Sequence, residues 1–290
     1  MSFNKNSRLD PSQVQDRRGM STGTRVAVGG GGIGILILLV ALLLGVNPGD
    51  LVNTAMVEPS YSDPYAGEIS DLATECQTGA DANTRTDCAL VGYVNSIQAF
   101  WSDVFAEQGI QYAPAQTVLY SGATEAACGY AQGAMGPFYC TLDQQVYLDL
   151  SFFDTLQQRF GAGGGPFAMA YVVSHEYSHH IQDLLGILEP GGQGPQSMTV
   201  YTELQADCLA GVWIAHAVDT GYLVQLTEQE IAQALDAAAA VGDDRIQSQT
   251  QGYVVPETWT HGSSDQRYSA LLDGIQSGDA NSCETPGWTE

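Results

Sequence analysis

The sequence predicts an α+β fold that is mostly helical, with a small sheet in its middle part, preceded by one transmembrane helix. Three observations predict this class. Apolar residues recur at helical spacing through the second half of the chain, strand-like alternation is confined to residues 116–150, and residues 26–46 form an apolar run without a charged side chain. A chain of 290 residues, 44% of them hydrophobic, is long enough for one sizeable domain.

The N-terminal part predicts a membrane anchor. Residues 1–25 are polar and arginine-rich, which indicates a short cytoplasmic tail. A helix over residues 26–46 would rise roughly 30 Å, enough to cross a bilayer core. Basic residues precede this transmembrane anchor and acidic residues follow it, so we expect a single-pass cell-membrane protein with a cytoplasmic N-terminus and an extracytoplasmic domain. A cleaved signal peptide is the alternative, but "GVNPGD" is a poor cleavage site.

Residues 47–75 contain "NPGD" and "EPSYSDPYAG" without an apolar pattern, and we interpret them as a linker. The folded domain is then expected over residues 76–290. Apolar residues at helical spacing predict its first helix over residues 85–107. A strand is predicted over 116–120 and a hairpin over 138–150, with "LDQQ" as its turn.

Capping residues and glycines divide the second half into helices. Ser151 and Asp154 can cap a helix that ends at Phe160, before "GAGGGP". Pro166 suits the first turn of a helix over 166–185, which Gly186 ends. Further helices are predicted over 199–220, 227–241 and 263–276, the second of them opened by a capping box of Thr227 and Glu230.

The charge is strongly acidic, at −24 from 9 basic and 33 acidic residues. The basic residues after residue 46 are Arg85, Arg159, Arg245 and Arg267. Such a surface repels nucleic acid and anionic lipid headgroups, so no nucleic acid partner is expected. Neutral or basic peptides remain possible ligands, and the acidity also keeps a domain soluble.

The six cysteines all follow the apolar run, and an even number beyond an export signal indicates disulfides. Six cysteines allow about 15 pairings. Spacing favours Cys76 with Cys88 and Cys128 with Cys140, which leaves Cys208 for Cys283. A thiolate metal site is the alternative, but the chain has no C-x-x-C pair.

A metal-binding motif stands at residues 175–179, where "HEYSH" matches H-E-x-x-H. Four residues of helix turn through about 400°, so the imidazoles of His175 and His179 stand one above the other and can bind one ion. Glu176 lies about 100° round the helix, within reach of a water on that ion. The alternative is a surface helix on which the two histidines are simply exposed. The apolar "FAMAYVV" before the motif argues against it, because such a run indicates a buried helix.

A zinc site needs a third protein ligand. Glu203 and Asp207 in "TELQADC" lie four residues apart, on one face of the next predicted helix. His180 and His216 point away from these faces, and we expect both to be packing or surface residues.

With these residues in view, the chain resembles the gluzincin type of zincin metallopeptidase, which combines H-E-x-x-H with a downstream E-x-x-x-D. More specifically, "SHEYSHHIQ", "TELQADCLAGVW", "GPFYC", "VYLDLSFF", "HGSSDQR" and the N-terminal "DRRG" resemble the neutral zinc metallopeptidase family of membrane-anchored bacterial proteins. The resemblance implies a zincin-like domain, Glu203 as third zinc ligand, and Asp207 as a residue that orients a ligating histidine. Tyr177 and Ser178 depart from the family pattern, outside the metal ligands.

A mechanism follows from these roles. Zinc lowers the pKa of a bound water towards about 7, and Glu176 is placed to accept its proton as the water attacks a peptide carbonyl. His261 is a candidate donor to the developing oxyanion, although it could equally cap or pack the last helix. Arg267 could bind a substrate carboxylate, but pairing with one of the many acidic residues is favoured.

We therefore expect a membrane-anchored, extracytoplasmic zinc metallopeptidase, a hydrolase whose partner is a peptide or protein substrate. Two alternatives stay open: a catalytically silent zincin-fold module that binds a protein, and a zinc amidase acting on cell-wall peptides. The presence of Glu176 argues against the silent module, because a structural zinc site gains nothing from a general base.

Overall fold

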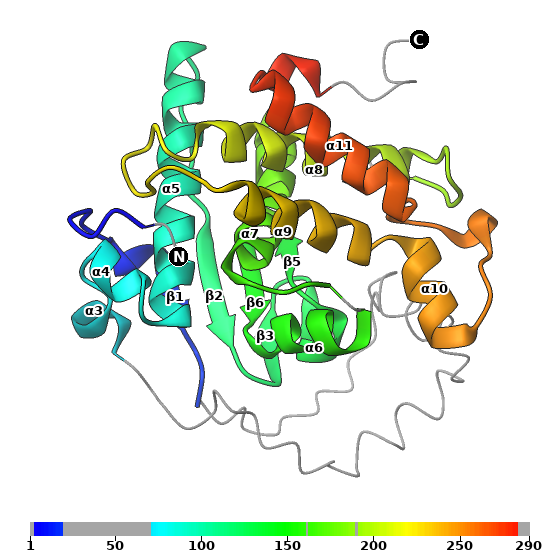
Figure 1. Ribbon diagram of the computed structural model, residues 1–290, viewed down its shortest axis with the longest axis horizontal. Coiled ribbons are helices and arrows are strands. Elements are labelled where there is room, and N and C mark those ends of the chain that lie inside the picture. The colour runs from blue at the N-terminus through cyan, green and yellow to red at the C-terminus, as the bar shows by residue number, and fades with distance from the viewer. Residues whose placement is uncertain (1–2, 20–70, 161, 189–190, 284–290) are drawn as a thin grey trace.

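The computed structural model describes residues 3–19, 71–160, 162–188 and 191–283, and its architecture is α+β as predicted (Figure 1). The predicted transmembrane anchor, residues 26–46, and most of the predicted linker lie outside these ranges. None of the helices within the described ranges has both the length and the apolar character that crossing a membrane requires.

Helices dominate the described part of the chain. The long ones are α5 (Thr86–Glu107), α6 (Ser151–Phe160), α7 (Pro166–Leu185), α8 (Met198–His216), α9 (Glu228–Ala240), α10 (Asp243–Gln251) and α11 (Ser264–Ser277). Two short helices, α3 (Leu72–Glu75) and α4 (Gly79–Ala82), precede α5. Single turns of 3-10 helix lie at Pro11–Gln13, Gly133–Met135, Pro256–Thr258 and Ala280–Ser282.

A four-stranded sheet has the order β1-β2-β6-β5. Its strands are β1 (Val14–Asp16), β2 (Gln116–Tyr120), β5 (Phe138–Cys140) and β6 (Gln145–Asp149). The pairs β1–β2 and β2–β6 are parallel, and β5 pairs with β6 as the predicted antiparallel hairpin. A second, two-stranded sheet of β3 (Ala123–Ala126) and β4 (Gly129–Gln132), which the sequence did not predict, is antiparallel.

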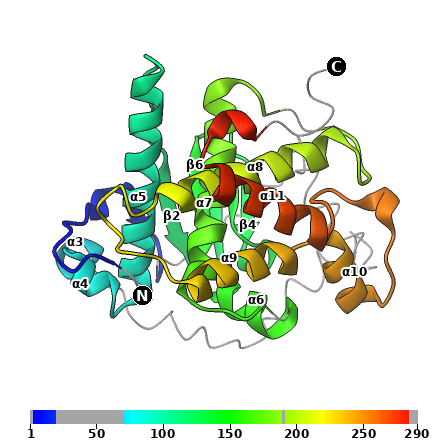
Figure 2. The same ribbon diagram turned by 45° about the horizontal axis from the view of Figure 1, so that its top comes forward.

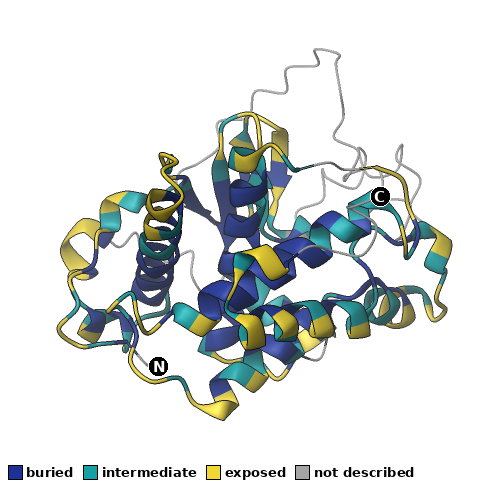
Figure 3. Ribbon diagram, turned by 90° about the horizontal axis from the view of Figure 1, so that it is seen from above, coloured by how far each residue is buried: buried dark blue, intermediate teal, exposed yellow. Residues whose placement is uncertain are grey.

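Helix α7 is the central element. It contacts α5, α8, α9 and the β5–β6 hairpin, so its apolar first turns and most of its later ones are buried. Figure 3 shows the buried residues concentrated on the central helices and the exposed ones at outer turns. Pro166 begins this helix, and Gly186 ends it in the left-handed conformation at φ 68°, where glycine carries no Cβ penalty. A buried helix interior is what the sequence predicted here.

Helices α8 and α11 lie side by side, and α8 also packs against α7 (Figures 1 and 2). Two facing glycines make this close approach possible. A Cβ on Gly211 would lie 2.3 Å from the backbone oxygen of Leu271, and one on Gly274 would lie 2.0 Å from that of Cys208. This close packing places side chains of α11 against α8.

The N-terminal residues depart from prediction. Residues 1–25 were expected to form a tail separate from the domain, but residues 3–19 pack against it, with β1 at the edge of the main sheet. The domain boundary at residue 76 is also too late, because α3 begins at Leu72, which is buried. A short segment with few apolar residues gives no periodic signal, and its order comes from the partners it meets.

Other element boundaries were close to prediction. Helix α8 is capped by the Ser197 side chain and ends at His216 rather than near residue 220. The capping box of Thr227 and Glu230 opens α9 as expected. Helix α10 was not predicted, because its sequence "DDRIQSQTQ" is polar and offers no apolar stripe. Three disulfides join Cys76 to Cys88, Cys128 to Cys140 and Cys208 to Cys283, the pairing that spacing favoured.

Candidate metal centre

Two adjacent helices bring together three potential metal ligands. His175 and His179 project from one face of α7, and Glu203 faces them from α8. One ligand atom from each residue can be chosen so that all three lie within 4.8 Å of one another. The four-residue spacing on α7 and the packing of α8 against it create this cluster, because neither helix alone supplies more than part of the set.

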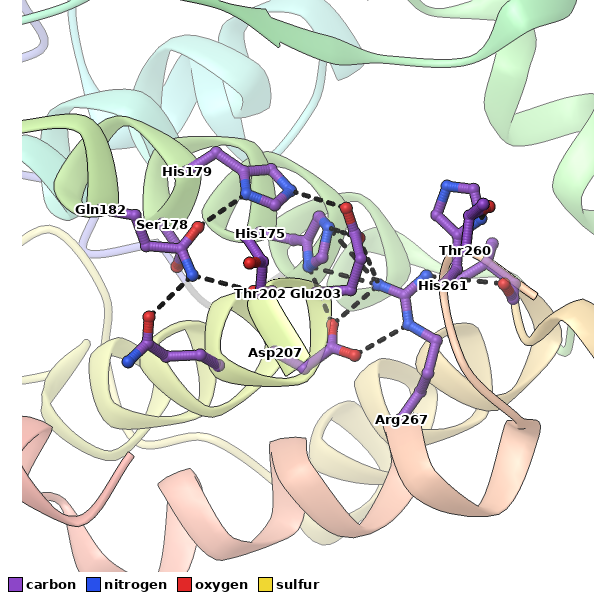
Figure 4. Close-up of polar contacts among 12 residues, drawn as sticks. His175, Ser178, His179, Gln182, Thr202, Glu203, Asp207, Thr260, His261 and Arg267 are labelled. Atoms are coloured by element: carbon purple, nitrogen blue, oxygen red, sulfur yellow. Dashed lines mark hydrogen bonds and ion pairs between the residues drawn. The ribbon is translucent and has the colours of Figure 1, made fainter. Parts of the chain in front are cut away.

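The imidazoles present the same nitrogen to Glu203. His175 Nε2 lies 3.1 Å from one carboxylate oxygen of Glu203, and His179 Nε2 lies 3.4 Å from the other (Figure 4). The opposite ring nitrogen is held in each case. His175 Nδ1 donates to Asp207 at 2.8 Å, and His179 Nδ1 donates to the side-chain oxygen of Gln182 at 2.8 Å. These bonds place the proton on Nδ1 and leave the Nε2 lone pairs to face the carboxylate.

The donor set calls for a cation. Two imidazole lone pairs and a carboxylate face one another, and an arrangement of acceptors alone would be repulsive. Without an ion, a proton on His175 meets this need, because against the opposing effect of burial the carboxylates of Asp207 and Glu203 raise the pKa of His175 to about 10. Two imidazoles and one carboxylate form a ligand set that zinc uses in catalytic sites, so the residues present fit this metal.

Asp207 is the centre of a buried polar network beside the site. Its side chain is fully buried, and it accepts hydrogen bonds from His175, from the Tyr171 hydroxyl at 2.7 Å and from both Nε and an Nη of Arg267. Burial alone favours the neutral acid, but Arg267 and His175 hold the pKa of Asp207 at about 2. The carboxylate therefore stays charged and fixes the ring of His175.

Arg267 is a structural partner of this carboxylate. It reaches Asp207 from α11, is 3% exposed, and lies 3.9 Å from Glu203. The close packing of α8 and α11 at Gly211 and Gly274 brings it there. Its guanidinium pairs with an acidic residue of the protein, the role that the sequence favoured over binding a substrate carboxylate.

Gln182 has a role that the sequence analysis missed. It is fully buried, three residues after His179, and it donates to the backbone oxygen of Thr202 at 2.8 Å and to Gln205 at 2.9 Å. These bonds from α7 to α8 fix the amide so that its oxygen receives the proton of His179. The available signal was its spacing, since residues three apart on a helix are neighbours.

Replacing Gln182 by alanine should weaken zinc binding by about 10- to 100-fold, because His179 loses the partner that fixes its tautomer and orientation. Competition with a chromophoric chelator measures the affinity. Gln276→Ala, an exposed amide on α11, is the matched control and should leave affinity unchanged. Equal affinity in Gln182→Ala and the native chain would contradict this role.

Glu176 points from α7 beside the ligands without joining them. Its residue is 8% exposed, and burial raises the pKa of its carboxyl group. Among the described residues, no donor forms a hydrogen bond or ion pair with this carboxylate. A carboxylate with a raised pKa and free oxygens, one residue from a metal ligand, is suited to accept and return a proton.

The other histidines lie apart from the three-ligand cluster. His180 is fully buried, donates from Nε2 to the Ala113 backbone oxygen at 2.7 Å and contacts the Tyr139 hydroxyl at 3.0 Å. His216 stacks on Phe100 at the far end of α8 and contacts Asp219 at 3.1 Å. The structure therefore places both outside the metal centre, where they serve packing.

His261 lies in the loop before α11, next to the cluster in Figure 4. Its side chain is 36% exposed and its Nδ1 lies 3.2 Å from Asp243, at the start of α10. Asp243 also accepts hydrogen bonds from the backbone N–H groups of Thr260, His261 and Gly262. One buried carboxylate therefore fixes these three residues of the loop. Against the effect of burial, Asp243 and then Glu203 raise the pKa of His261.

The chain is similar to other bacterial proteins over most of its length. A family model described as "Putative neutral zinc metallopeptidase" matches residues 1–286. "Uncharacterized protein Rv2575" of Mycobacterium tuberculosis is 46% identical over 255 residues, which is 84% of each chain. "Uncharacterized protein YpfJ" of Escherichia coli K12 is 37% identical over 295 residues, 97% of each chain. No solved structure matches the chain significantly.

Proposed function

Since the chain belongs to this family of neutral zinc metallopeptidases, whose description implies a zinc cofactor, we propose that it hydrolyses peptide bonds with Glu176 as general base. One observation carries the proposal. Beside the cluster of His175, His179 and Glu203 lies the buried carboxylate of Glu176, which forms no hydrogen bond or ion pair with another described residue. A metal site that only stabilises a fold has no use for such a group.

The residues divide the chemistry among them. His175, His179 and Glu203 would hold zinc, which supplies a Lewis acid for the carbonyl oxygen and acidifies water. Glu176 accepts a proton from the attacking water and returns it to the leaving amine, which its raised pKa favours. Asp207 and Gln182 hold the Nδ1 atoms of His175 and His179, so that the Nε2 atoms would be free to bind the ion.

His261 is the proposed donor to the oxyanion that develops on the carbonyl. It lies close enough to Glu203 for that carboxylate to raise its pKa, and Asp243 holds its Nδ1 and raises its pKa further, which favours the protonated ring that donates best. Asp243 acts through His261 and is a positioning residue.

His261→Ala should lower kcat by about 100-fold with zinc content unchanged, because the variant loses one donor to the transition state and no ligand. Steady-state kinetics on a cleaved peptide, with zinc measured by elemental analysis, test this. His216→Ala removes a histidine outside the centre and is the matched control. An unaltered kcat in His261→Ala would leave the residue a purely structural role.

The decisive experiment for the activity uses the purified, zinc-loaded chain and a peptide library, with and without a chelator. Cleavage that the chelator abolishes and added zinc restores is the expected result. Zinc bound stoichiometrically without any cleavage would instead select a silent binding module. Cleavage of cell-wall fragments alone would select an amidase.

We propose further that the domain works outside the cytoplasm, attached to the cell membrane through residues 26–46. The three disulfides support an oxidising compartment, since such bonds are rare where glutathione keeps thiols reduced. A peptide or protein substrate from that compartment is the proposed partner, and the acidic charge of −24 disfavours nucleic acid.

A further inference from the structure

The N-terminal residues 3–19, here called the N-terminal segment, complete the domain. Strand β1 within it pairs in parallel with β2, matching Val14, Gln15 and Asp16 to Thr117, Val118 and Leu119. The ladder continues as the Arg17 N–H donates to the Leu119 oxygen at 2.7 Å. Without the segment, β2 would be an uncovered edge of the main sheet.

Buried polar groups of the domain are satisfied by the N-terminal segment. Asn95, 1% exposed on α5, accepts the Asp10 N–H at 2.7 Å and donates to the Asp10 oxygen and to Gln13, each at 3.0 Å. Gln98, on the next turn of the same helix, donates to Gln13 at 2.9 Å. Without the segment, the side-chain amides of Asn95 and Gln98 would lose these hydrogen-bond partners.

The domain also has a socket shaped for the first residues of the segment. Phe3, 3% exposed, packs against α5 where residue 92 is glycine, and a Cβ there would lie 2.4 Å from the Phe3 ring. The Phe3 ring meets Tyr93 at a centroid distance of 4.8 Å. The backbone around it is tied at both sides, since Asn4 N–H donates to the Tyr222 oxygen and Gly79 N–H to the Ser7 oxygen.

The arginines of the segment are part of the same docking. Arg18, 5% exposed, forms ion pairs with Asp16 at 2.7 Å and with Asp87 of α5 at 3.0 Å. Arg17 donates to the Glu125 backbone oxygen at 3.2 Å and lies over the Tyr147 ring. Arg17 and Arg18, two of the basic residues from which a cytoplasmic tail was predicted, therefore contact the domain. Their charge does not require the segment to lie on the other side of the membrane from the domain.

We infer that the N-terminal segment lies on the same side of the membrane as the metal-binding domain. A single crossing by residues 26–46 would put the two on opposite sides, and β1, Phe3 and Arg18 could then not occupy the places described above. The inference rests on the proposed membrane attachment, and it excludes a single crossing of the bilayer between the N-terminal segment and the domain.

Cysteine labelling tests the inference directly. All six native cysteines are paired, so an introduced cysteine is the single free thiol. Lys5→Cys marks the segment and Ser102→Cys marks α5 of the domain, and both positions are exposed. Each full-length variant is treated with a membrane-impermeant maleimide in spheroplasts and after lysis, and the ratio of the two signals is compared.

Equal ratios for the two variants are the expected result. Labelling of Ser102→Cys in spheroplasts with labelling of Lys5→Cys only after lysis, or the reverse, would overturn the inference. If both label only after lysis, the segment and the domain still share one side, but the proposed extracytoplasmic location is contradicted. The two proposals therefore fail separately.

Hydrogen exchange of the purified full chain gives a second, independent measurement. The Arg17 amide should exchange far more slowly than in an unstructured peptide, because it is bonded to Leu119 within the sheet. Exchange at the rate of a free peptide would show the segment undocked and would overturn the inference as well.

Discussion

Glu176→Gln is expected to lower the rate of peptide hydrolysis by about 10²- to 10⁴-fold while zinc content and fold stay unchanged. Glutamine keeps the size and polarity of the side chain but cannot take up a proton at neutral pH. The proposed metal ligands are other residues, so the ion should remain at one equivalent per chain. Kinetics and elemental analysis on the same preparation measure both quantities.

Glu107→Gln, at the exposed end of α5, is the matched control because it removes one carboxylate far from the site. It should leave the rate and the zinc content at their native values. A fully active Glu176→Gln enzyme would remove Glu176 as general base. A variant that lost its zinc would show that the carboxylate helps to hold the ion.

Glu203→Ala is expected to abolish activity by releasing the metal. Glu203 is the only carboxylate of the three-ligand cluster, and its oxygens lie against both histidines. Zinc affinity should fall by more than about 100-fold, beyond the 10- to 100-fold typical of residues that only orient a ligand. Chelator competition measures the affinity, and dialysed samples should contain little zinc by elemental analysis.

Two controls accompany this variant. Glu257→Ala, an exposed carboxylate outside the cluster, should bind zinc as the native chain does. Asp207→Asn keeps all three proposed ligands and should show the smaller loss, because it changes only the hydrogen bonds that Asp207 accepts from His175, Tyr171 and Arg267. Native zinc affinity in Glu203→Ala would exclude this residue as the third ligand, and a loss in Asp207→Asn exceeding that in Glu203→Ala would point to Asp207.

The regular elements were largely predictable from the sequence. Helix α7 carries its own start at Pro166, its stop at Gly186 and an apolar run between them, and such signals act over a few residues. Helix α10 and the β3–β4 sheet lack an apolar pattern, so their formation depends on what they pack against. The order of β1 depends in the same way on contacts about 100 residues away.

The parts of the candidate metal centre that depend on local sequence could be predicted, and the parts that depend on contacts distant in sequence could not. The spacing of His175 and His179 on one helix sets their common face, whatever the rest of the fold does. Glu203 and Asp207 could be nominated from their spacing, and the resemblance to a family assigned their roles. Gln182 and Asp243 were missed because each acts through one hydrogen bond that a sequence does not display.

The sequence by itself thus determined the H-E-x-x-H helix, the candidate ligands and an even set of cysteines, since these follow from helical periodicity and residue chemistry. Tertiary structure alone decided that α8 presents Glu203 to both histidines, that Arg267 neutralises Asp207 rather than facing substrate, and that residues 3–19 belong to the domain. Each of these depends on packing between elements distant in sequence. Such packing is set by close approaches such as that of Gly211 and Gly274, which no local pattern encodes.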